Sequence, residues 1–165
     1  MAFFSWSKTA ASNASADATI NWAEGQPPAS VNDSARAMMA RLAEYRDDTS
    51  GLLATGGTST AYTLTTNQGL AATPTDGQLI AFTPHTGNGS AATLAADGGG
   101  AFPLQSAATV ALAAASIVQG TPYAAKFNAS ASAWVMFGLY ANPFNLPVGS
   151  VLPYFGASAP NANFA

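Results

Sequence analysis

The residues whose side chains could do chemistry are few and scattered in this sequence. The chain contains no cysteine, one histidine (His85) and eight carboxylate residues that do not gather around that histidine. Thiolate metal sites and disulfides are therefore excluded, and a histidine-based metal centre has too few ligands. We expect no catalytic residue, no metal site and no cofactor.

Two carboxylates in the part of the chain after Thr49, Asp76 and Asp97, are the remaining candidates for acid–base chemistry. A glycoside hydrolase needs two such groups facing each other across a cleft. Each of them, however, is followed by glycine, and Asp-Gly is typical of turns in which the carboxylate accepts backbone hydrogen bonds. His85 lies in a predicted loop, and no serine occupies a Gly-x-Ser-x-Gly turn. The sequence therefore predicts a protein that is not an enzyme.

The apolar content of the chain is dominated by alanine. Hydrophobic residues make up 48% of the 165 residues, but 38 of them are alanine, and Val, Ile, Leu and Phe together number only 30. Such a content of large side chains is near the lower limit for a chain that folds by itself. The formal net charge of −3 is too small to indicate disorder. We therefore expect the chain to bury further surface against copies of itself.

The charged and apolar residues also exclude some classes of partner. The five Lys and Arg residues form no basic patch, which argues against nucleic-acid binding. No apolar stretch is long enough for membrane insertion. Lys8 follows the apolar residues of the N-terminus, which is the reverse of the order in a signal peptide.

One segment has the pattern of a helix. Seven of the thirteen charged residues lie between Asp33 and Asp48. Apolar residues in the same segment are spaced 4, 3, 4 and 3 apart, as in the contact stripe of a coiled coil. These residues are Val31, Ala35, Met38, Leu42 and Tyr45. We predict a helix over 30–50 that packs on its symmetry mates, because two heptads are too short to be stable alone.

The segment before the helix, residues 1–29, is rich in small and polar residues but carries large aromatic ones. Those with the greatest apolar surface are Phe3, Phe4, Trp6 and Trp22. Ordering such a segment costs about 1–2 kcal/mol per residue, so its aromatic side chains must bury surface somewhere. We expect an extended arm that docks on a partner. The alternative is that Trp22 packs against the chain's own helix.

Residues 51–140 have the pattern of a compact antiparallel β domain. Short apolar runs bounded by turn residues predict strands at 61–66, 78–83, 91–95, 101–104, 109–112, 123–128 and 133–139. The Gly and Asn residues between these runs adopt turn conformations at low cost. The alanine-dense segment 107–115 is also compatible with a short helix.

Aromatic residues in this nearly uncharged region allow a second function. Lectin-like sites stack an aromatic ring on a sugar and surround it with polar groups. Tyr62, Tyr123 and Trp134 are the candidates for glycan contact, and the alternative is that they form the hydrophobic core. A carbohydrate-binding module that attaches to host cell-surface glycans is therefore the alternative function.

Several motifs resemble those of bacteriophage tail fibre proteins. Residues 21–39, NWAEGQPPASVNDSARAMM, are similar to a segment near the N-terminus of many of these proteins, where it precedes a β-rich shaft. The runs AYTLTT at 61–66 and SAWVMFG at 132–138 are similar to that shaft. Residues 147–155, PVGSVLPYF, resemble the opening of a tail-collar domain, so 141–165 are expected to form a linker and the first strand of a collar-like module.

This resemblance implies a structural protein in the tail of the virion, assembled in the host cytoplasm without a signal peptide. The arm, with Phe3, Phe4, Trp6 and Trp22, would dock on other phage tail or baseplate proteins, and distal parts would meet host surface polysaccharide. Together with the patterns above, it predicts an α+β, mainly β, parallel homotrimer. The expected order is an extended N-terminal arm, a short trimeric helical bundle and a compact antiparallel β domain of the fibre shaft.

Overall fold

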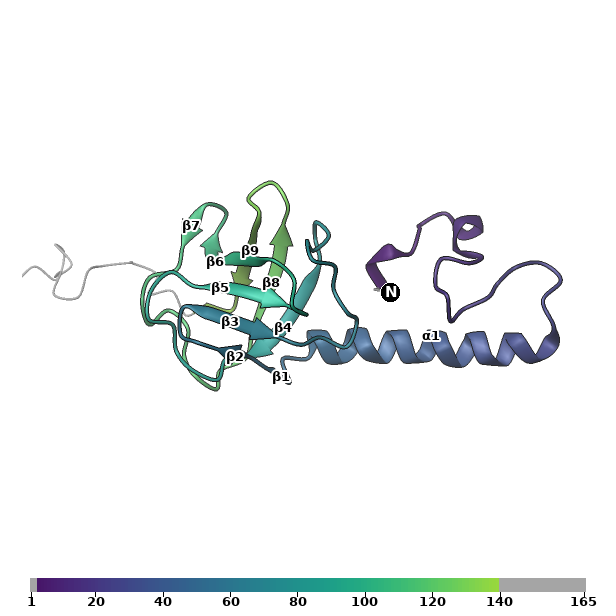
Figure 1. Cartoon of the computed structure of the whole chain (residues 1–165), viewed down its shortest axis with the longest axis horizontal. Helices are drawn as coiled ribbons and strands as arrows, with labels where there is room; N and C mark the ends of the chain where they lie inside the picture. Colours follow the sequence, from purple (N-terminus) through teal and green to yellow (C-terminus); the bar gives the residue numbers. More distant parts are fainter. Residues whose placement is uncertain (1–2, 140–165) are drawn as a thin grey trace, which may run out of the picture.

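The computed structural model describes residues 3–139, and the predicted linker and collar strand at 141–165 lie outside the described residues. The chain has an N-terminal part, made of an arm and one long helix, and a β domain at the C-terminal end of that helix (Figure 1). The arm contains two short 3₁₀ helices, η1 (Phe3–Ser5) and η2 (Ala10–Asn13). The fold is therefore mainly β with a single α-helix in the described part.

Helix α1 (Pro28–Thr49) begins two residues before its predicted start. Proline suits the first position of a helix because its missing N–H needs no partner there and its φ is already helical. No side chain caps this end, and Ser30 Oγ lies 2.8 Å from the carbonyl oxygen of Pro27. After the helix, Gly51 has a φ of 84°, a conformation that glycine adopts without strain.

The β domain contains nine short strands. They are β1 (Leu53–Ala54), β2 (Gly56–Gly57), β3 (Ala61–Leu64), β4 (Leu79–Thr83), β5 (Thr93–Ala96), β6 (Ala101–Ala107), β7 (Val110–Ala111), β8 (Tyr123–Asn128) and β9 (Ala133–Phe137). All seven predicted strands are present: β8 has its predicted bounds, and the other six are shifted at one or both ends. Strands β1 and β2 were not predicted because two residues are too short to show a period. The ambiguous segment 107–115 contains β7 and no helix.

The sheet is mixed, which corrects the expectation of an antiparallel domain. Its strand order is β1-β4-β8-β9-β6-β5-β3-β2, with β7 beside β6. The pairs β1–β4, β3–β5 and β6–β9 are parallel, and the other pairs are antiparallel. Parallel neighbours require a long crossover connection rather than a hairpin. In each of these pairs the chain leaves one side of the curved sheet and later returns to it, so that the second strand runs in the same direction as the first.

The curved sheet nearly closes around one hydrophobic core (Figure 1). Strand β8 shows how the core forms, because its buried residues alternate with residues of greater exposure along the strand. Lys126 is on the exposed side, and Phe127 next to it is only 1% exposed. The largest fully buried apolar side chains are Trp134, Tyr62, Phe82, Phe127, Ile80, Leu94, Leu104 and Ile117.

The end of α1 is joined to the β domain by the buried carboxylate of Asp48. One oxygen accepts hydrogen bonds from the backbone N–H (2.8 Å) and side-chain amide (2.7 Å) of Asn67. The other accepts from the same two groups of Gln68, at 3.1 and 3.0 Å. A carboxylate with no exposed surface needs such donors to replace water. These four bonds fix the position of the C-terminal end of α1 on the β domain.

Candidate functional site

The N-terminal arm folds back along α1, which corrects the expectation of an extended arm (Figure 1). Ser34 Oγ accepts a hydrogen bond from the backbone N–H of Asn21 (2.9 Å) and donates to the carbonyl oxygen of the same residue (3.0 Å). Arg41 Nε donates to Asp17 Oδ2 at 2.8 Å. Polar contacts therefore hold the middle of the arm on one face of the helix.

The ion pair between Asp17 and Arg41 is the central contact of this face. The side chains of Asp17 and Arg41 are 2% and 19% exposed, and Arg41 also pairs with Glu44 at 2.9 Å. Burial raises the pKa of Asp17, but the hydrogen bonds from Arg41 and Thr19 outweigh it and lower the pKa from 3.8 to about 2. The hydrogen bonds to Asp17 and Glu44 raise the pKa of Arg41. Both groups are charged at neutral pH.

The aromatic residues at the start of the arm pack on the helix. The rings of Phe3 and Tyr45 stack with their centroids 4.9 Å apart, and Phe4 meets the edge of Tyr45 at 6.1 Å. Trp6 lies beside Phe3, at 5.0 Å. Tyr45 was predicted to face symmetry mates, and in this chain it contacts the arm.

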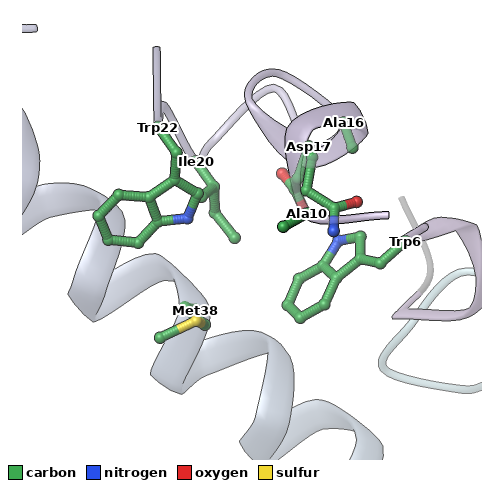
Figure 2. Close-up of a pocket in the computed structure, with 8 residues that line it drawn as sticks. Trp6, Ala10, Ala16, Asp17, Ile20, Trp22 and Met38 are labelled. Atoms are coloured by element: carbon green, nitrogen blue, oxygen red, sulfur yellow. The ribbon is translucent and has the colours of Figure 1, made fainter. Parts of the chain in front are cut away.

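A cavity of about 220 Å³ lies between the arm and the helix. Figure 2 shows the indole rings of Trp6 and Trp22 on opposite sides of it, with Met38 reaching up from α1. The remaining lining residues are Ala10, Asn13, Ala16, Asp17 and Ile20. The cavity is smaller than the roughly 300–1,000 Å³ of typical small-molecule sites, so its size fits one large side chain. Trp22 is 38% exposed and thus only partly packed towards the chain's own helix.

The predicted contact stripe of the helix is divided between two environments. Met38 and Tyr45 face the arm, whereas Val31 and Leu42 remain 40% and 48% exposed. Ala35 is half-buried. Met39, which the heptad pattern did not include, is 68% exposed. The adjacent methionines at 38 and 39 were the available signal that the apolar surface is wider than one stripe.

The predicted glycan-contact residues are in the core, which corrects that assignment. Tyr62, Tyr123 and Trp134 are 1%, 3% and 0% exposed. Their polar atoms face the interior: Tyr62 Oη donates to the carbonyl oxygen of Thr86 at 2.8 Å, and Tyr123 Oη accepts from the N–H of Val118 at 3.0 Å. Burial, and then Tyr123, raise the pKa of Tyr62. A domain with few large side chains uses its aromatic rings to fill its centre.

The carboxylates considered for acid–base chemistry act in separate loops. Asp76 Oδ1 accepts a hydrogen bond from the N–H of Ala129 (2.9 Å), and Asp97 Oδ2 accepts from the N–H of Leu70 (2.7 Å). His85 is exposed, and its Nδ1 lies 2.8 Å from Thr55 Oγ1. Within residues 3–139, no three His, Asp or Glu side chains are grouped so that they could hold a metal ion. The two carboxylates therefore share no partner and position loops.

No protein-family model matches the chain, and no curated protein sequence is similar to it. Over the same described range, no helix has both the length and the apolar character needed to cross a membrane.

Proposed function

We propose that this chain is a structural component of a bacteriophage tail fibre, which docks on the tail or baseplate and carries distal host-recognition parts. The observation that carries the proposal is the exposed apolar surface of α1, formed by Val31, Met39 and Leu42 next to the aromatic arm. Exposed apolar side chains gathered on one helix are typical of an interaction surface. The resemblance of the N-terminal motif NWAEGQPP and of the shaft-like runs to tail fibre proteins is what suggests this kind of assembly.

The exposed surface of α1 favours a parallel homotrimer. The helix projects away from the β domain and carries the arm along it (Figure 1), so symmetry copies would approach the apolar residues that the arm leaves exposed, Val31, Met39 and Leu42. Val31 and Leu42 are separated by eleven residues, about three helical turns, and therefore lie on the same side of the helix. Three copies would bring these side chains together around a common axis, as in a short coiled coil.

The arm is the proposed contact with the tail or baseplate. The cavity between Trp6 and Trp22 is apolar on most of its surface and large enough for one side chain of a partner. Tryptophan is enriched at the centres of protein interfaces because it buries a large area with little loss of conformational freedom. A tail protein that inserts an apolar side chain between the two indoles would hold the fibre at its N-terminal end.

The mass of the purified chain in solution tests the proposal. We expect light scattering to give about three times the mass of the 16.6 kDa chain. Leu42→Asp would place like charges together in a desolvated site and should convert the trimer to monomer. Val110→Asp is the matched control, because Val110 is equally exposed, at 50%, but lies on β7. A folded wild-type monomer, or a trimer that Leu42→Asp leaves intact, would contradict the trimeric helix.

A further inference from the structure

The surface of α1 that the arm leaves uncovered begins next to the cavity between Trp6 and Trp22. Among the residues that line this cavity, Met38 is the one that belongs to α1, and the others come from the arm (Figure 2). These residues enclose the cavity only in part. Met39, the next residue of the helix, is not among them and is 68% exposed. Two adjacent methionines therefore have different environments.

The helical repeat places these two methionines on opposite sides of Leu42. Each residue of an α-helix turns about 100° around the axis and rises about 1.5 Å along it. Met38, four positions before Leu42, is therefore about 40° to one side of it, and Met39, three positions before, is about 60° to the other side. The other helix residues that bond or stack with the arm are all on the Met38 side. They are Ser34, Arg41 and Tyr45. Leu42 is 48% exposed, so the uncovered apolar surface extends from it towards Met39.

In a parallel trimer, this arrangement brings the two methionines of different copies together. A three-fold axis along the bundle places the same residue of each copy at the same height. Each helix then turns one flank to its first neighbour and the opposite flank to its second. With Leu42 directed at the axis, the Met38 flank of one helix therefore faces the Met39 flank of the next. The two methionines differ in height by only about 1.5 Å, so they meet at the level of the cavity.

We propose that the partner subunit's Met39 packs beside Met38 and forms the missing wall of the cavity, so that the docking site for the tail protein is built from two chains. The inference rests on the proposed trimer and specifies its docking site. Methionine suits this position, because its flexible thioether fills irregular gaps and makes favourable contacts with aromatic rings such as those of Trp6 and Trp22. A monomer would present an incomplete site, and a trimer would present three equivalent ones. Docking on the tail would therefore depend on assembly of the fibre.

A contact between chains tests this site in the wild-type protein. The methionine methyl groups are isotopically labelled, and nuclear Overhauser effects between them and the indole protons of Trp6 and Trp22 are measured by NMR. We expect such an effect from Met39, and it must come from another copy, because within one chain Met39 is on the far side of Leu42 from the arm. Met39→Leu identifies the signal. A trimer by light scattering that lacks this effect would overturn the inference alone, whereas a monomer would contradict the trimer of the proposed function as well.

A variant measures what Met39 contributes to binding in the cavity. The probe is toluene, which is about the size of one apolar side chain, titrated while the indole N–H resonance of Trp22 is followed. Met39→Ala should leave the trimer intact, because Val31 and Leu42 remain, and should weaken toluene binding by about fivefold through loss of one wall. Leu52→Ala is the control, because Leu52 is 81% exposed and lies outside α1. Unchanged toluene affinity in trimeric Met39→Ala would show that Met39 is not part of the site, and a wild-type trimer that binds no toluene would contradict docking in this cavity.

Discussion

The β domain and the N-terminal part of this chain are held together by different interactions. The β domain buries large apolar side chains, with Phe82, Phe127 and Trp134 at 1% exposure or less. Within residues 3–50, the arm and helix bury only four residues. These are Asp17, Ile20, Ser34 and Asp48, of which three are polar. Apolar burial stabilises the first part, whereas hydrogen bonds, one ion pair and the packing of Phe3 and Phe4 on Tyr45 position the arm on the helix in the second.

This difference shows where the low content of large apolar residues matters. Averaged over the chain, 30 such residues predict a thin core. The structure concentrates many of them in the β domain, which has a full core of its own, and leaves Val31, Met39 and Leu42 of α1 exposed. The expectation that the chain needs additional copies of itself therefore applies to the helix rather than to the β domain.

The largest effect is expected from a cavity in the β domain. Trp134→Ala removes a fully buried side chain and should lower the free energy of unfolding by about 3–5 kcal/mol. Trp22→Ala in the arm should lower it by less than Trp134→Ala does, because Trp22 is 38% exposed and has less buried surface to lose. Chemical denaturation of both variants measures this. Equal losses of unfolding free energy in the two variants would mean that the arm is packed as tightly as the core of the β domain.

The junction between the two parts should be the next most sensitive position. Asp48→Ala leaves four donors of Asn67 and Gln68 without an acceptor and should cost about 3 kcal/mol. Asp47→Ala is the matched control, since the Asp47 side chain is 43% exposed and its ion pair with Arg46 contributes little. Hydrogen exchange at the amides of residues 67 and 68 reports the junction. If these two amides remain protected from hydrogen exchange in Asp48→Ala, Asp48 does not hold the junction.

The smallest of these effects concerns the arm. The folded-state pKa of Asp17 is about 2, below its ordinary 3.8, so the stabilisation is complete above about pH 4 and is lost as the pH falls towards 2. Its size is about 2 kcal/mol. Asp17→Asn should abolish this dependence and increase proteolysis of the arm at neutral pH. Asp33→Asn removes an ion pair whose partners are both 75% exposed and should change neither property measurably.

Local patterns in the sequence were sufficient to locate most elements of the fold. The heptad spacing placed α1 to within two residues at each end, and the apolar runs placed seven of the nine strands. These patterns depend on neighbours within a few residues, so they are visible without an alignment. The glycan-contact residues could not be assigned in this way. Whether an aromatic residue on a strand faces the core or solvent depends on which strands close over it.

Composition and spacing by themselves determined that this chain is mainly β, has one amphipathic helix and lacks the residues for thiolate metal chemistry. Tertiary structure alone decided that β3 lies parallel to β5, that Asp17 meets Arg41 across 24 residues, and that Phe137 is exposed while Trp134 is buried. The physical reason is distance along the chain. Propensity and periodicity act between near neighbours, whereas parallel pairing, an ion pair between arm and helix and the shape of a cavity require residues far apart in sequence to meet.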